Sequence, residues 1–224
     1  MKTPIFPNVL FYLTIVFSFP EMAVHATPRT TIVFGDSITE GNALPKNERS
    51  QAWIRLVEIQ SEGQLLMINE GKGGRPTSSI SEFTTMLQRQ PRPDILVIAL
   101  GTNDSRDISD QCVPKAVKNI EAMILQARDA YGQNLPIVIV APPNIRKDAL
   151  GPSHAIADQR EEKLQSLGSA FKTLAETNKC EFVSLYGAVP ESALTRDGVH
   201  PSGKGNQPIA TRMLEKLLSI PFAK

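Results

Sequence analysis

The sequence predicts an α/β fold, a three-layer α/β/α sandwich in which helices cover both faces of a five-stranded parallel sheet. Two observations predict it. Five short apolar runs, rich in branched residues, alternate along the chain with segments of helical periodicity. The runs are almost continuously apolar, as expected for strands that are buried on both faces. The chain has 224 residues, which suits one substantial domain better than two.

The five apolar runs give the strands. In chain order they are Thr31–Phe34, Leu65–Ile68, Ile95–Leu100, Ile137–Val140 and Phe182–Leu185. In a parallel sheet the carboxyl ends of the strands meet at one edge, and ligands bind beyond that edge. We therefore expect the functional residues in the loops that follow the strands.

Apolar residues at helical spacing occupy the intervals between the strands. The clearest segments are 117–131 and 164–174, and weaker ones are 53–57, 80–87 and 209–217. A capping box, Ser79-x-x-Glu82, is expected to begin the helix over 80–87. The only tryptophan, Trp53, is expected to pack in the core of its helix rather than to stack on a sugar.

Residues 1–26 have the features of a secretory signal peptide. Lys2 precedes an apolar run from Val9 to Phe19, and Val24-His25-Ala26 fits the small-residue rule for cleavage after Ala26. The run is shorter than the roughly 20 residues that cross a bilayer, so we expect no stable membrane insertion. The prediction is a domain over 27–224 that is secreted or periplasmic.

The charges are balanced, with 24 lysines and arginines against 23 aspartates and glutamates, and no long basic block occurs. This balance argues against a nucleic acid partner. Export would permit a disulfide between Cys112 and Cys180. However, Cys112 follows the carboxyl end of one predicted strand and Cys180 precedes the amino end of another. We expect two free, mostly buried thiols.

Ser37 lies directly after the first buried strand, in Gly35-Asp36-Ser37. A hydroxyl at this position can be exposed at the sheet edge and serve as a nucleophile. The alternative is an ordinary serine at a helix N-cap. Asp36 is expected to cap the same turn or to steady the loop rather than to act in the chemistry.

Asp197 and His200 lie three residues apart in a loop after the fifth strand. A carboxylate at this spacing can orient the imidazole, which can then take a proton from a hydroxyl and return it to a leaving group. Alone, the pair is weak evidence, because Asp and His often form a structural hydrogen bond in a loop.

Two further glycine loops can supply donors for an oxyanion. Asn103, in Gly101-Thr102-Asn103-Asp104, offers a side-chain amide, and Gly71–Gly74 offers backbone amides that a substrate can approach closely. The amide of Ser37 is a third donor. The alternatives are a tight turn at the glycines and a side-chain turn at Asn103.

Gly-Asp-Ser, a glycine loop, Gly-x-Asn-Asp and Asp-x-x-His occur in this order, and together they resemble the four blocks of SGNH/GDSL hydrolases. The resemblance runs from Thr31 to about Gly205. It implies a flavodoxin-like sandwich that hydrolyses esters without a metal or a cofactor. In the family the oxyanion glycine usually falls five positions after the leading asparagine of its loop.

Carried over to this chain, the resemblance makes Ser37 the nucleophile, His200 the general base and acid, and Asp197 its orienting partner. The oxyanion hole consists of the Ser37 amide, the Asn103 side chain and a glycine amide. The family spacing selects Gly74, and the adjacent Gly73 is the alternative.

Other kinds of site fit less well. Residues 198–204 match the start of a P-loop, but Gly205 replaces its Ser or Thr and Pro201 removes a backbone donor. Pro76 replaces the third glycine of a dinucleotide fingerprint. The three histidines, His25, His154 and His200, are scattered, so no metal-ligand set is recognised.

The substrate is expected to be a small-molecule or glycan ester. Export and the Gly74-Arg75 pair are similar to carbohydrate esterases, which suggests removal of O-acetyl groups. Lysophospholipase, thioesterase or arylesterase activity and a non-catalytic glycan-binding module are the alternatives. The loop 141–152 is expected to form a wall of the cleft, and Arg75 and Arg106 either contact substrate or are solvated.

Overall fold

The computed structural model describes residues 27–221 and contains one parallel sheet of five strands in the order β2-β1-β3-β4-β5. The strands are β1 (Arg29–Gly35), β2 (Leu65–Gly71), β3 (Ile95–Ala99), β4 (Ile137–Ala141) and β5 (Glu181–Ser184). All five strands were predicted, with ends that differ by up to three residues. The expected signal peptide lies outside the described residues.

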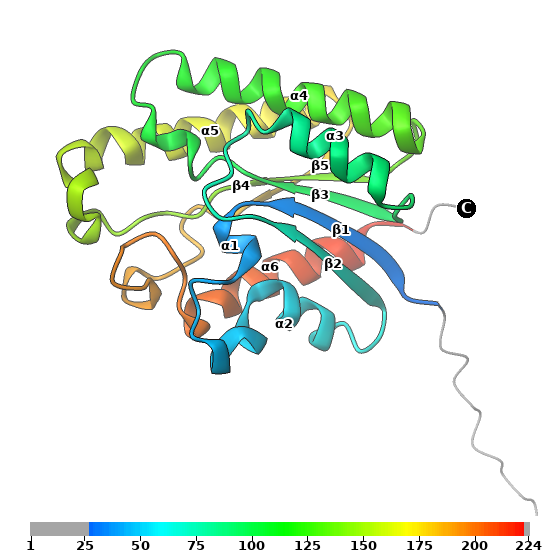
Figure 1. The fold of residues 1–224 in the computed structure, drawn as a ribbon, viewed down its shortest axis with the longest axis horizontal. Coiled ribbons are helices and arrows are strands. Elements are labelled where there is room, and N and C mark those ends of the chain that lie inside the picture. Colours follow the sequence, from blue (N-terminus) through cyan, green and yellow to red (C-terminus); the bar gives the residue numbers. More distant parts are fainter. Residues whose placement is uncertain (1–26, 222–224) are drawn as a thin grey trace, which may run out of the picture.

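Six α-helices cover the sheet on both faces (Figure 1). They are α1 (Ser37–Glu40), α2 (Trp53–Gln60), α3 (Ile80–Arg89), α4 (Cys112–Tyr131), α5 (Ala157–Thr177) and α6 (Gly203–Ser219). Helices α3, α4 and α5 lie on one face, and α1, α2 and α6 lie on the other. The predicted three-layer α/β/α sandwich is confirmed.

The core consists of one apolar layer on each side of the sheet, because alternate residues of a strand point to opposite faces. Ile32 and Phe34 of β1 pack with α3, α4 and α5, whereas Val33 packs with α2 and α6. Trp53 is 2% exposed within the second layer, as its helical position predicted.

Strand β2 corrects the expectation that every strand is buried on both faces. It is an edge strand in which only Leu65 and Met67 are buried, and Leu66 is 46% exposed. The predicted capping box is also wrong. Ser79 occupies the N-cap of α3 but its side chain makes no capping hydrogen bond, and Glu82 instead pairs with Lys72 and Arg75.

The register of β1 positions the functional loops. Gly35, the last residue of β1, pairs with Gly71 of β2 on one side and with Ala99 of β3 on the other. The three strands therefore end at the same level, and the loops that follow them lie side by side.

Cys112 and Cys180 are both free, as predicted; Cys112 is buried and Cys180 is half-buried. Among residues 27–221, no helix is both long and apolar enough to span a bilayer.

Candidate active site

Ser37, His200 and Asp197 meet at the carboxyl edge of the sheet. The His200 Nε2 atom lies 2.8 Å from the Ser37 Oγ atom, and the His200 Nδ1 atom lies 2.6 Å from the Asp197 Oδ2 atom. Ser37 follows β1 and the other two residues belong to the loop between β5 and α6, so the sheet brings together groups that are 163 residues apart in sequence.

The two oxygens of Asp197 have separate partners. Oδ1 accepts hydrogen bonds from the amides of Val199 and His200 and from the hydroxyl of Thr195, at 2.9 to 3.0 Å. This fixes the carboxylate so that Oδ2 faces the imidazole. Because a carboxylate only accepts, Nδ1 carries the imidazole proton, and Nε2 is left to accept from the Ser37 hydroxyl.

Partial burial acts to raise the pKa of Asp197, but the hydrogen bonds to its carboxylate outweigh burial and hold the pKa well below its ordinary value. The residue is therefore an anion throughout the neutral range, and its negative charge favours a positive imidazole beside it.

Ser37 is the first residue of the short helix α1, and Asp36 rather than Ser37 is its N-cap. The Asp36 Oδ1 atom accepts from the Ile38 amide at 2.9 Å, which confirms the expected capping role. Burial raises the pKa of Asp36 to about 6, although hydrogen bonds from the Ile38 amide and the Thr102 hydroxyl favour its charged form. The Ser37 side chain is thereby left free to reach His200.

Four candidate oxyanion donors lie in the segments that follow β1, β2 and β3. Within residues 27–221, the amides of Ser37, Gly73 and Gly74 have no hydrogen-bond acceptor. Asn103 donates one of its two amide hydrogens to the Arg75 carbonyl oxygen at 3.1 Å, so the second hydrogen is available. Gly74 has a φ of +73°, which favours glycine, but both Gly73 and Gly74 remain candidates.

A second contact, between Thr77 and Asp104, joins the glycine loop to the Asn103 loop. The Asp104 carboxylate accepts from the Thr77 amide at 3.0 Å and from the Thr77 hydroxyl at 2.5 Å. Burial raises the pKa of Asp104, although the hydrogen bonds from Thr77 oppose this shift. Sequence reasoning assigned no role to either residue; the only signal was that Asp104 belongs to the Gly-x-Asn-Asp block.

Arg75 is not exposed to a substrate in this structure. It is 8% exposed, and its guanidinium donates to the Gly35 carbonyl oxygen at 2.8 Å and pairs with Glu82 at 3.0 Å. Arg106 is exposed, and so is His154, whose Nδ1 atom lies 3.1 Å from the Lys147 carbonyl oxygen. His154 is therefore a surface histidine.

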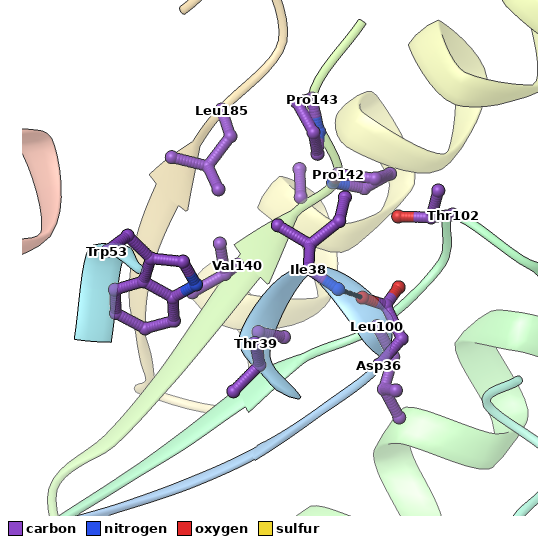
Figure 2. A pocket seen from close by; sticks show the side chains of 12 residues that line it. Asp36, Ile38, Thr39, Trp53, Leu100, Thr102, Val140, Pro142, Pro143 and Leu185 are labelled. Carbon is purple, nitrogen blue, oxygen red and sulfur yellow. Dashed lines mark hydrogen bonds between the residues drawn. The ribbon is translucent and has the colours of Figure 1, made fainter. Parts of the chain in front are cut away.

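A small cavity of about 20 Å³ lies next to the turn that follows β1. Figure 2 shows Ile38 in the middle of the side chains that line the cavity, with Pro142, Pro143 and Leu185 around it and Trp53 to one side. Because Asp36 and Ile38 both line the cavity, it adjoins the turn that carries Ser37. A volume of this size holds about one water molecule or a methyl group.

The loop after β4 packs against the loop of Asp197 and His200. The Arg146 amide donates to the Gly198 carbonyl oxygen at 2.7 Å. No group of three or more metal-ligating side chains occurs in the part of the chain that the structure describes.

Three solved structures are among those with the same fold. A carbohydrate acetylesterase family member from Sinorhizobium meliloti has a TM-score of 0.74 at 22% identity, covering 84% of this chain and 97% of its own. The M. smegmatis aryl esterase has a TM-score of 0.73 at 20% identity, covering 86% of this chain and 100% of its own. The Enterococcus faecalis lipase/acylhydrolase has a TM-score of 0.66 at 22% identity, covering 84% of this chain and 95% of its own.

No curated protein sequence matches the chain. The family model of the GDSL-like lipase/acylhydrolases matches residues 33–207, which is most of the chain and includes every residue of the site described above. The chain therefore belongs to the GDSL-like lipase/acylhydrolase family and is a carboxylic ester hydrolase.

Proposed function

We propose that the chain is a secreted serine esterase that removes short acyl groups, chiefly O-acetyl groups of carbohydrates, through an acyl-enzyme. The observation that carries this proposal is the imidazole of His200, which lies within hydrogen-bond distance of both the Ser37 hydroxyl and the Asp197 carboxylate. This is the arrangement that activates a serine for acyl transfer.

In the first half of the proposed reaction, Ser37 Oγ attacks the ester carbonyl carbon while His200 Nε2 takes its proton. The resulting oxyanion accepts hydrogen bonds from the Ser37 amide, the Gly74 amide and the free N–H of Asn103. Asp197 stabilises the positive imidazole that forms. The tetrahedral intermediate then expels the alcohol, which takes the proton from His200, and the acyl group remains on Ser37.

The second half reverses these roles with water. His200 Nε2 takes a proton from a water molecule, whose oxygen attacks the acyl carbon, and the same donors hold the oxyanion. Collapse of this intermediate returns the proton to Ser37 Oγ and releases the carboxylic acid.

The cavity that adjoins the Ser37 turn supports the proposal that the acyl group is short. Its volume of about 20 Å³ accepts a methyl group but not a long chain. Its walls include Pro142 and Pro143, from the loop that the sequence suggested as a wall of the cleft. The carbohydrate part of the proposal draws support from the S. meliloti acetylesterase family member of similar fold.

Aryl esters are the second candidate class, because the M. smegmatis aryl esterase has a nearly equal TM-score. A lysophospholipase or thioesterase of the same family would need room for a longer acyl chain. A glycan-binding module without turnover would not need the contacts of His200 with Ser37 and Asp197.

The first test is hydrolysis of p-nitrophenyl acetate, butyrate and octanoate by residues 27–224, beside the Ser37→Ala variant. We expect turnover of the unsubstituted chain to be fastest with the acetate ester. We expect Ser37→Ala to have no turnover but to remain folded, because Ser37 is half-buried and its hydroxyl does not contribute to core packing. Preference for octanoate would replace the short-acyl proposal with lipid substrates. Equal turnover by Ser37→Ala would reject Ser37 as the nucleophile.

Two further measurements separate the remaining parts of the proposal. Acetate release from acetylated oligosaccharides, compared with hydrolysis of phenyl acetate, distinguishes a carbohydrate esterase from an aryl esterase. N-terminal sequencing of the exported protein tests residues 1–26 as a signal peptide, for which we expect a new terminus at Thr27.

A further inference from the structure

Arg75 is the residue through which three loops of the site meet. We propose that its buried guanidinium is a positioning residue for the oxyanion hole, holding the glycine loop and Asn103 in register with Ser37. This inference rests on the proposed function, because it concerns how well the oxyanion of that reaction is stabilised. It assigns Arg75 a structural reason to affect catalysis although the side chain is turned away from substrate.

The guanidinium binds the end of β1. Its Nη1 atom donates to the Gly35 carbonyl oxygen at 2.8 Å and also to the Glu70 carbonyl oxygen. Gly35 lies two residues before Ser37 and Glu70 is the next-to-last residue of β2. One guanidinium therefore bridges the end of the strand that precedes Ser37 and the end of the strand that leads into the glycine loop.

The guanidinium is itself held from two sides. Its Nε and Nη2 atoms lie 3.1 and 3.0 Å from Glu82 Oε2 on α3, and its Cζ atom lies 4.0 Å from the centre of the Phe34 ring. The Arg75 side chain is only 7% exposed. An arginine fixed by an ion pair, an aromatic face and two carbonyl oxygens has little freedom left to bind a substrate.

The backbone of Arg75 positions the oxyanion donors directly. Its amide donates to the Lys72 carbonyl oxygen at 3.3 Å and closes the turn that contains Gly73 and Gly74. Its carbonyl oxygen accepts from the Asn103 side chain at 3.1 Å. Fixing the side chain of Arg75 therefore also fixes the glycine amides and the Asn103 amide.

The same network explains why lysine is a poor substitute. A lysine ammonium can pair with Glu82, but it is a single point with no planar fork, so it cannot bridge Glu82 and two separate carbonyl oxygens in the same geometry. A displacement of about 1 Å in a catalytic group lowers turnover on the order of a hundredfold. We expect kcat to fall with little change in KM, because the oxyanion donors that Arg75 positions act on the transition state.

The test uses Arg75→Ala, Arg75→Lys and a control, Arg89→Ala. Arg89 pairs with the side chain of Glu70 but is 60% exposed and contacts no loop of the site. We expect kcat for p-nitrophenyl acetate to fall on the order of a hundredfold in Arg75→Ala and at least about tenfold in Arg75→Lys. Arg89→Ala should remain within a few-fold of the unsubstituted chain.

Rescue of kcat by guanidinium chloride, added at a non-denaturing concentration, distinguishes a positioning role of Arg75 from general destabilisation of the fold. Guanidinium can occupy the space vacated in Arg75→Ala and donate to Gly35, Glu70 and Glu82, so it should restore kcat in this variant and not in Ser37→Ala. Circular dichroism checks that each variant is folded. If Arg75→Ala does not fold, kcat and KM of Arg75→Lys decide the question.

Arg75 variants with kcat within a few-fold of the unsubstituted chain would overturn the inference alone. A rise in KM that accounts for the whole decrease in kcat/KM would also overturn it, because it would make Arg75 a substrate contact. Absence of Ser37-dependent turnover in the unsubstituted chain would overturn the proposed function and, with it, this inference.

Discussion

Asp197 and Asn103 each use one polar atom to hold the site together and leave another for a role in the proposed reaction. Asp197 uses one oxygen to fix its loop and the other to orient His200. Asn103 likewise uses one N–H to bind the Arg75 carbonyl oxygen and keeps the other. This division means that a substitution at either residue removes both a chemical group and an anchor.

For Asn103 we expect the chemical effect to dominate. Replacing Asn103 with alanine should lower kcat for p-nitrophenyl acetate by about a hundredfold or more, as when one oxyanion donor is removed from other enzymes. The measurement is steady-state kinetics beside Asn178→Ala, since Asn178 is the C-cap of α5 and its side chain donates only to the Leu174 carbonyl oxygen of the same helix. An unchanged rate in Asn103→Ala would reject Asn103 as a donor.

At the scale of an element, the conformation of the loop between β5 and α6 depends on Gly198. This residue has a φ of +70°, and a Cβ atom added to it would lie 2.4 Å from the Arg146 carbonyl oxygen. The Gly198 carbonyl oxygen also accepts from the Arg146 amide. The loop that carries Asp197 and His200 therefore keeps its shape because it lies directly against the backbone of the loop after β4.

Gly198→Ala and Gly187→Ala form a matched pair that tests this close approach. Gly187 also has a φ of +70°, but a Cβ atom there would meet nothing within 4 Å. Gly187→Ala should therefore cost only about 1–2 kcal/mol, which is the penalty of a left-handed backbone. Gly198→Ala should cost more in the free energy of unfolding and should lower kcat at least about tenfold by displacing His200.

Urea unfolding and ester hydrolysis measure the two effects. Equal behaviour of the two variants would show that the contact with Arg146 does not hold the loop.

For the whole molecule, the carboxyl edge of the sheet contains acids that folding takes out of water. Burial raises the pKa of Asp36 to about 6 from an ordinary value of 3.8. Between these values the folded chain binds more protons than the unfolded chain. The contribution of Asp36 therefore lowers the free energy of unfolding as the pH rises from about 4 to about 6.

Asp36→Asn should remove this contribution while keeping an oxygen for the Ile38 amide. We expect the variant to gain stability relative to the unsubstituted chain as the pH rises from about 4 to about 6, by on the order of 3 kcal/mol. Urea unfolding at several pH values measures the difference. A difference that stays constant across this range would mean that Asp36 does not take up its proton there.

Activity has a separate pH dependence. At acid pH kcat/KM should decrease, because a His200 imidazole that already carries a proton on Nε2 cannot accept the proton of Ser37. The measurement is the pH profile of p-nitrophenyl acetate hydrolysis. A profile that stays flat into acid pH would count against His200 as the base.

Much of the fold and the members of the site could be predicted from local patterns. Continuous apolar runs indicated all five strands, and residues just after those strands indicated Ser37 and Asn103. The contact between Ser37 and His200 needed the strand order as well. The capping box failed because Glu82 has a stronger partner in the Arg75 guanidinium, which lies outside the helix and is invisible to helix rules.

The sequence by itself determined the alternation of strands and helices and the order of the blocks that contain the candidate site residues, because these depend on periodicity and on position along the chain. Tertiary structure alone decided that β2 is an edge strand, that Arg75 is buried beneath the glycine loop and that Thr77 binds Asp104. Those features depend on which distant atoms come within a few ångströms of each other. A linear pattern carries no such distances, since only the packed sheet brings its loops together.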